Sequence, residues 1–185
     1  MLTTNFTLIQ ELTTDRLVLR KLVLADAPQI LNMRGDDAVM QYIGKDKILT
    51  IADAETFINW INKSLDENEG ITWAITLKET PHILIGTVGF WRLIKQHYRA
   101  ELGYMLSPDY WKKGIMKEAI LKLIEIGFTD IKLHSIEAHI NPDNKASASV
   151  LLSTGFKREA CLKENFYYKG LFRDTEIYSL LQKPV

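Results

Sequence analysis

The fold is decided by residues 98–119, which read YRAELGYMLSPDYWKKGIMKEA. An apolar run over 100–106 predicts a strand, and helical spacing begins at Ile115, after the basic turn 111–114. A helix start exposes about four unpaired N–H groups and carries roughly half a positive charge, so it binds phosphate or pyrophosphate without a dedicated side chain. The segment therefore predicts an anion site. Three lysines would reinforce it: Lys112, Lys113 and Lys117.

Length and charge limit the class of protein. With 185 residues, 46% of them hydrophobic, the chain can close one good core, and we expect one domain over 1–185. Lysine plus arginine equals aspartate plus glutamate, at 23 each, so no global basic field is available to hold nucleic acid. We therefore expect any anion to be bound locally, and no nucleic-acid partner.

Cysteine usage and the N-terminus indicate a compartment. The single cysteine, Cys161, excludes an intramolecular disulfide. The first residues, MLTTN, lack the basic and then apolar layout of a signal peptide. No apolar run approaches the roughly 20 residues of a membrane span, so we expect a cytoplasmic protein without a membrane partner.

The first half of the chain predicts one strand, two helices and a hairpin. Period-two alternation marks the first strand, helix caps mark the two helices, and the turn cluster KETP separates the two arms of the hairpin. The expected elements are a strand at 14–22, helices from Asp26 to Met33 or Arg34 and from Thr50 to Asp66, and strands at 72–77 and 83–93.

The second half continues from the opening segment. Its expected elements are a helix from Ile115 to about Gly127, a strand at 135–140, a helix at 146–154, and strands at 156–168 and 173–181. This order favours an α/β sandwich around a mixed sheet, with one parallel strand–helix–strand crossover. Ligands of open α/β sheets bind beyond the carboxyl ends of such strands, and the basic turn lies at one of these ends.

Several stretches resemble a known family. They are AELGYML at 100–106, YWKKGIMKEA at 110–119, NKAS at 144–147 leading to Gly155 and Phe156, and TDRLVLR at 14–20. Together they are similar to the GNAT superfamily of acetyl-CoA-dependent N-acetyltransferases, and within it to the RimJ/RimL-like branch, named for enzymes that acetylate ribosomal-protein N-termini. The resemblance covers about 11–181. It implies an α/β (α+β) sandwich with a mixed, mostly antiparallel sheet of six to seven strands, helices on both faces, and a central parallel pair splayed at the cofactor site.

The basic turn departs from the family pattern, which is Gln or Arg, two variable residues, Gly, one variable residue, then Gly or Ala. Trp111 holds the first place and Met116 the last, and Gly114 alone is kept. Since backbone N–H groups bind the pyrophosphate, we expect the site to survive, with Met116 adding a side chain where a close backbone approach is usual. The resemblance implies that acetyl-CoA, a cosubstrate, is held by Tyr104, Met105, Leu106, Trp111, Lys112, Lys113, Gly114, Ile115, Met116, Asn144 and Ser147.

Acetyl transfer needs a neutral amine, a stabilised oxyanion and a proton for the departing thiolate. Glu137 and Glu101 are the candidates for removing the amine proton, directly or through water, and each could instead face solvent or pair with a cation. The resemblance implies that Asn144 touches pantetheine and that Ser147 protonates the thiolate. The alternative is that either residue only caps the helix. The tyrosine acid of many relatives is excluded, because Leu151 holds its place.

The acceptor is left open by the sequence. We expect direct attack by a primary amine, either a protein N-terminus, as in the ribosomal-protein enzymes, or a small amine such as a polyamine, an amino acid or an aminoglycoside. Neutral net charge mildly disfavours a strongly cationic acceptor. A noncatalytic acyl-CoA sensor and a nucleotide-binding α/β enzyme are the competing hypotheses. No histidine spacing typical of zinc is present, so no metal is expected, and both a monomer and a homodimer are compatible with the sequence.

Overall fold

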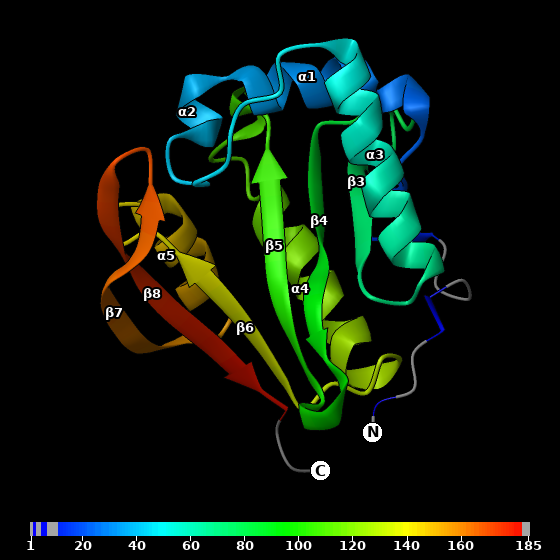
Figure 1. Cartoon of the computed structure of the whole chain (residues 1–185). Helices are drawn as coiled ribbons and strands as arrows, with labels where there is room; N and C mark the ends of the chain where they lie inside the picture. The colour runs from blue at the N-terminus through cyan, green and yellow to red at the C-terminus, as the bar shows by residue number, and fades with distance from the viewer. Residues whose placement is uncertain (1, 3–4, 7–10, 183–185) are drawn as a thin grey trace.

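The computed structural model describes residues 2, 5–6 and 11–182 (Figure 1). Its centre is one sheet of eight strands in the order β1-β2-β3-β4-β5-β6-β8-β7. The strands are β1 (Leu12–Thr13), β2 (Leu17–Lys21), β3 (Ile71–Leu77), β4 (Gly86–Ile94), β5 (Arg99–Leu106), β6 (Ser135–Ile140), β7 (Lys157–Tyr168) and β8 (Leu171–Leu181). All neighbouring pairs are antiparallel except β5 and β6, which are parallel.

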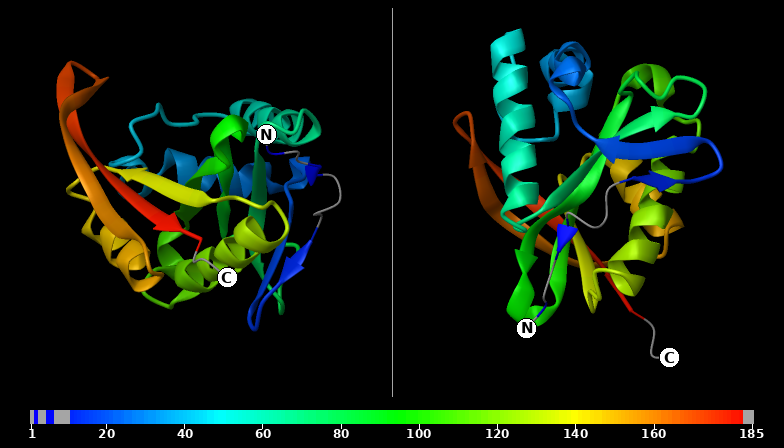
Figure 2. Two further views of the ribbon diagram at one scale, coloured as in Figure 1. Left: turned by 90° about the horizontal axis from the view of Figure 1, so that it is seen from below. Right: turned by 90° about the vertical axis from the view of Figure 1, so that its right-hand side faces the viewer.

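Helices cover both faces of the sheet. The α-helices are α1 (Ala27–Gly35), α2 (Asp37–Met40), α3 (Ile51–Asp66), α4 (Ile115–Thr129) and α5 (Lys145–Ser153). The right-hand view of Figure 2 shows α1 and α3 on one side of the central strands and α4 on the other. No helix in the described part of the chain is long and apolar enough to cross a membrane.

The parallel pair separates soon after it forms. β5 and β6 are in register only from Arg99 opposite Ser135 to Glu101 opposite Glu137. Beyond that point β5 continues for five residues, paired with β4 alone, and Figure 1 shows β5 and β6 diverging toward their carboxyl ends. This divergence opens the middle of the sheet on the side where α4 begins.

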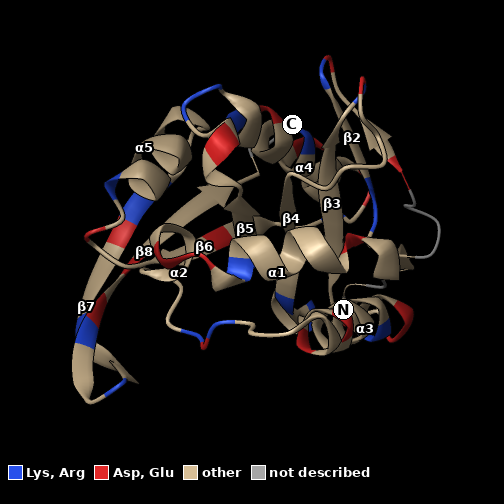
Figure 3. Ribbon diagram, turned by 90° about the horizontal axis from the view of Figure 1, so that it is seen from above, with Lys and Arg blue, Asp and Glu red and all other residues tan. Residues whose placement is uncertain are grey.

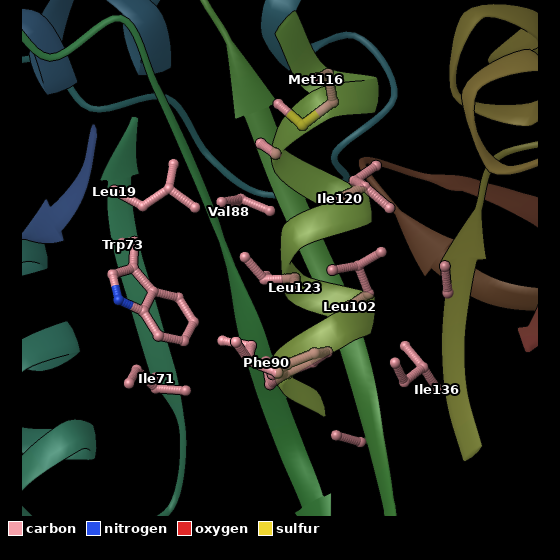
Figure 4. Packing of buried hydrophobic residues seen from close by; sticks show 14 of the residues in the cluster. Leu19, Ile71, Trp73, Val88, Phe90, Leu102, Met116, Ile120, Leu123 and Ile136 are labelled. Atoms are coloured by element: carbon pink, nitrogen blue, oxygen red, sulfur yellow. The ribbon is translucent and has the colours of Figure 1, made fainter. Parts of the chain in front are cut away.

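Two apolar clusters fix these layers. The larger one packs α4 onto the sheet: Figure 4 shows Ile120 and Leu123 of α4 between strand residues such as Val88 and Ile136. The smaller one packs α1 and α3 onto the opposite face. Because side chains alternate along a strand, Leu102 and Leu106 face α4 and Met105 faces α1 and α3.

The predicted fold class is confirmed, with three differences in detail. The sheet has eight strands instead of six or seven, because β1 spans only two residues and is too short to show alternation. The four-residue helix α2 was not predicted from the sequence. Asp26 stands at the N-cap of α1, but its carboxylate does not cap that helix, since it accepts from Arg20 at 2.7 and 2.8 Å and from the Val23 N–H.

Candidate functional site

The basic turn reaches α4 through a left-handed backbone. Lys112 has φ 59° and Gly114 has φ 75°, a region that glycine occupies without strain. Gly114 is the N-cap of α4 and offers no side chain to the helix end. Its carbonyl accepts from the Glu118 N–H at 3.1 Å, so the N–H groups of residues 115–117 have no partner within the helix and point out of its first turn.

Arg16, just before β2, holds this turn from behind. Its Nη1 donates to the Lys113 carbonyl at 3.0 Å and its Nε donates to Glu118 Oε2 at 2.7 Å. Glu118 Oε1 also accepts from the Arg16 N–H at 2.9 Å and from the Thr14 hydroxyl at 2.5 Å. Burial alone would raise the pKa of Glu118, but these hydrogen bonds outweigh it, and the pKa is lowered. The turn is therefore tied to the first long strand.

A cavity of about 500 Å³ lies in front of the turn, where β5 and β6 have separated. Its walls come from α2 and the residues after it, the end of β5, the start of α4 and the start of α5. It brings together most of the residues that the sequence indicated for the cofactor: Tyr104, Met105, Leu106, Trp111, Lys112, Gly114, Ile115, Met116, Asn144 and Ser147. Lys113 is not among the lining residues, and its Nζ lies 5.4 Å from the centre of the Tyr110 ring.

The edge of β5 presents backbone groups to this cavity. The Ser107 N–H donates to the Ile85 carbonyl at 2.9 Å, on the β4 side. Because the hydrogen bonds of an antiparallel pair alternate along the strand, the N–H groups of Tyr104 and Leu106 are directed to the opposite side, toward the gap. The same alternation directs the Met105 N–H toward β4. Met105 lines the cavity, but its N–H is not directed into it.

The two residues that depart from the family pattern occupy different surroundings. Trp111 donates from Nε1 to the Leu106 carbonyl at 2.8 Å and keeps 39% of its surface exposed, so it ties the turn to the end of β5. Met116 is 7% exposed and belongs to the larger apolar cluster, and Figure 4 shows its side chain at the first turns of α4. The Met116 side chain therefore packs into the core.

The start of α5 forms the facing wall. Asn144 Oδ1 accepts from the Ser147 N–H at 3.0 Å, which is the capping arrangement, and this cap uses the amide oxygen of Asn144. Ser147 is half-buried and lines the cavity beside Tyr104. Burial raises the pKa of the Tyr104 hydroxyl to about 12, so this group is neutral at physiological pH.

The wall formed by α2 is held by the hairpin of β7 and β8. Tyr168 donates from its hydroxyl to the Lys45 carbonyl at 2.9 Å, across 123 residues of sequence. The Phe166 ring lies against Gly44, where a Cβ atom would overlap it. The loop after α2, whose first residues 41–43 line the cavity, is therefore fixed by a distant part of the sheet.

The two predicted carboxylates face each other across the parallel pair. Glu101 and Glu137 are register partners, on the face of the sheet that α1 and α3 cover. Glu101 is 4% exposed and pairs with Arg92 at 3.3 Å, whereas Glu137 pairs with Arg99 at 3.4 Å. Neither carboxylate lines the cavity, and both lie just before the point where the strands separate.

His139 joins this pair, and sequence reasoning missed it. Its Nε2 lies 3.6 Å from Glu137 Oε1 and its Nδ1 lies 4.0 Å from Glu101 Oε2. Burial raises the pKa of Glu101, opposed by His139 and Arg92. The signal was available, since two residues along a strand return to the same face.

The same three side chains are a group, within the part of the chain that the structure describes, whose ligand atoms could hold a metal ion. One ligand atom from each of Glu101, Glu137 and His139 lies within 4.8 Å of the others. Arg92 and Arg99 already offset the charge of the two carboxylates, and a cation would have to compete with them. Carboxylates and an imidazole in such proximity are also groups that can exchange protons.

Comparison with known proteins gives consistent matches. The chain matches the family described as "Acetyltransferase (GNAT) domain" over residues 16–157. It is 37% identical over 171 residues to the uncharacterized N-acetyltransferase YoaA of Bacillus subtilis (strain 168), over 92% of this chain and 96% of that protein. It is 30% identical over 96 residues to the ribosomal-protein-serine acetyltransferase of Escherichia coli (strain K12), over 52% of this chain and 54% of that protein.

A solved structure extends the comparison to the fold. The spermidine N-acetyltransferase from Vibrio cholerae, in complex with CoA and spermine, superimposes with a TM-score of 0.79 at 24% sequence identity. The match covers 91% of this chain and 97% of that one. At this identity the likeness is one of fold.

Proposed function

The chain belongs to the GNAT family of N-acetyltransferases, and from that premise we propose that it moves an acetyl group from acetyl-CoA onto the N-terminal amine of a protein. The observation that carries the proposal is the separation of β5 and β6 beside a cavity of about 500 Å³. A cleft of this volume suits the narrow pantetheine arm of CoA. The reaction is a direct attack of the amine on the thioester, without a covalent enzyme intermediate.

The described residues fit acetyl-CoA at both ends of the cavity. The outward N–H groups at residues 115–117 suit the pyrophosphate, with Lys112 and Lys117 adding charge from the exposed side of the turn. The inward N–H groups of Tyr104 and Leu106 suit the pantetheine arm and the thioester carbonyl, whose oxygen becomes negative during attack. Backbone N–H groups make these contacts, so the departures from the family pattern at Trp111 and Met116 are compatible with cofactor binding.

Glu137 is proposed as the base that takes the proton of the attacking amine. It lies on the face opposite α4, so cofactor and amine would approach from different sides of the sheet. Because Glu137 stands just outside the cavity, the proton would reach it through water. Glu101 is more buried and is bound by Arg92, which suits a supporting role. Ser147, on the facing wall, is proposed to donate a hydrogen bond to the departing sulfur.

The charges near these carboxylates favour an acceptor with one amine. Arg92 and Arg99 pair with the two glutamates, and His139 lies between them. A polyamine carries several positive charges and needs several carboxylates that are free to bind it. Figure 3 shows segments with lysine or arginine and segments with aspartate or glutamate both distributed along the ribbon. A protein N-terminus matches this balance better than spermine does.

The test is an acceptor comparison with wild-type protein and acetyl-CoA. Thiol release and mass spectrometry are followed with a panel of peptides that have free N-termini, with the same peptides blocked at the N-terminus, and with spermine. The proposal expects one added acetyl group on free peptides and none on blocked ones. If spermine is acetylated faster than every peptide, the acceptor is a polyamine and not a protein N-terminus. If CoA binds and no thiol is released with any acceptor, the protein is not an active acetyltransferase.

A further inference from the structure

One side chain in the cavity wall has a polar atom without a partner. The Tyr104 hydroxyl is buried, and no hydrogen bond to it is formed within residues 2, 5–6 and 11–182. A buried hydroxyl left unsatisfied costs about 1–3 kcal/mol, so such groups are uncommon in folded proteins. Tyr104 comes from β5 and lines the cavity where α5 begins. We therefore expect the Tyr104 hydroxyl to find a hydrogen-bond partner among the groups that line the cavity.

Ser147 is a polar residue of the facing wall and lines the same cavity. It is close enough to act on the pKa of the Tyr104 hydroxyl, although the pair does not meet hydrogen-bond geometry. The Ser147 N–H is used by Asn144, and this cap fixes the backbone of the residue. A serine hydroxyl can accept one hydrogen bond and donate another, so Ser147 Oγ can accept from Tyr104 while its own hydrogen is turned toward the cavity.

We propose that Tyr104 is a positioning residue of the acetyl transfer, which orients the Ser147 hydroxyl toward the sulfur of CoA by donating a hydrogen bond to Ser147 Oγ. This inference rests on the proposed function. The bond from the amine nitrogen to the acetyl carbon forms, and the carbon–sulfur bond breaks. The electron pair of that bond stays on the sulfur, where the Ser147 hydrogen bond stabilises it, and the amine proton passes through water to Glu137.

Tyr104 is a hydrogen-bond donor in this arrangement and not the source of a proton. Its pKa of about 12 lies roughly three to four units above that of an ordinary thiol, so full transfer to the thiolate would be unfavourable by more than about a thousandfold. The thiolate instead takes its proton from solvent after it leaves. Tyr104 and Ser147 end the reaction as they began it, and no further reactant is needed.

The experiment is a double-mutant cycle of Tyr104→Phe and Ser147→Ala, measured by thiol release with acetyl-CoA and an accepted amine. Tyr104→Phe should lower kcat about tenfold, the loss of one net hydrogen bond, and leave the KM for acetyl-CoA within about twofold. In the Ser147→Ala background the same change should alter kcat less than about twofold, because its target is gone. An unchanged kcat, or an equal loss in both backgrounds, would overturn the proposal.

Tyr178→Phe is the matched control. Tyr178 is also a core tyrosine, but its hydroxyl donates to Glu176 at 2.9 Å and is not part of the cavity wall. This variant should keep the wild-type kcat while losing a buried hydrogen bond, so thermal unfolding of the two phenylalanine variants separates loss of stability from loss of turnover. A wild-type protein without turnover would contradict the proposed function, whereas active wild-type protein with an equally active Tyr104→Phe variant would contradict only this inference.

A binding measurement supplies a readout besides activity. If Ser147 is oriented toward the sulfur, it stabilises the thiolate of bound CoA, and the pKa of the bound thiol, followed by the ultraviolet absorbance of the thiolate, should rise in Tyr104→Phe and in Ser147→Ala. The double variant should show no larger rise than Ser147→Ala alone. A bound thiol whose pKa is the same in all four proteins would contradict the orientation of Ser147.

Discussion

Arg16 donates its Nη1 hydrogen to the Lys113 carbonyl oxygen at 3.0 Å, across 97 residues of sequence. The same guanidinium donates to Glu118, one turn into α4, so a single side chain contacts both sides of the helix start. The outward N–H groups of residues 115–117 lie between these contacts. The orientation proposed for pyrophosphate binding thus depends on a residue outside the turn.

Arg16→Lys should weaken CoA binding. Lysine keeps the charge but lacks the planar fork that contacts two acceptors at once, so the turn should lose its fixed orientation. We expect the CoA dissociation constant, measured by calorimetry, to rise about fivefold while kcat changes little. Arg158→Lys is the matched control, because Arg158 pairs with Glu176 at 2.8 Å on the β7–β8 hairpin. Equal CoA affinity in the wild type and Arg16→Lys would remove Arg16 from the binding site.

Glu118→Gln should change how stability depends on pH. The pKa of Glu118 is lowered in the fold, so its carboxylate stabilises the protein above the ordinary value of 4.5, and this contribution is lost as pH falls through the folded pKa. At neutral pH we expect the variant to be less stable by about 1–2 kcal/mol. The difference should shrink as pH falls below 4.5. Denaturant unfolding across that range measures it, and a difference independent of pH would contradict the ionic origin.

The order of elements could be predicted from the sequence because local patterns carry it. Alternation marked β2, the cap Thr50 marked the start of α3, and β6 was predicted with its observed bounds. The change from strand spacing to helical spacing also predicted the start of α4 at Ile115, where the helix begins. Each of these features is decided by neighbours within one or two turns.

The features that sequence reasoning missed depend on contacts between distant segments. Tyr104 was assigned to the cofactor by its backbone, and nothing local places its hydroxyl against Ser147, 43 residues later by the numbering. Arg92 reaches Glu101 because β4 and β5 shift register between Trp91 and Ile94, where Arg92 has φ 48°. A bulge of this kind is not visible in a hydrophobic pattern.

Gly114→Val should disturb the turn through backbone strain. A Cβ atom at Gly114 would meet only the end of the Arg16 side chain, at 3.5 Å, so space is available, but φ is 75° and a β-branched residue is strained there. We expect a loss of about 1–3 kcal/mol in stability and at least about tenfold weaker CoA binding, measured by unfolding and by calorimetry.

Gly170→Val is the control for Gly114→Val. Gly170 has φ 82°, no atom of the described residues lies within 4 Å of an added Cβ, and it lies in the turn of the β7–β8 hairpin. The two variants should lose comparable stability, and only Gly114→Val should lose CoA affinity. An unchanged dissociation constant in a folded Gly114→Val protein would place the pyrophosphate elsewhere.

Glu137→Gln should separate catalysis from cofactor binding. The amide keeps the size of the side chain but cannot take a proton, so we expect kcat to fall about a hundredfold while the CoA dissociation constant stays within about twofold. Glu101→Gln should lower kcat less, because Glu101 is bound by Arg92 and is more deeply buried. Both variants are compared with the wild type in thiol release over a range of pH. If Glu137→Gln turns over normally at every pH and Glu101→Gln does not, the base is Glu101; if both turn over normally, the amine loses its proton to water alone.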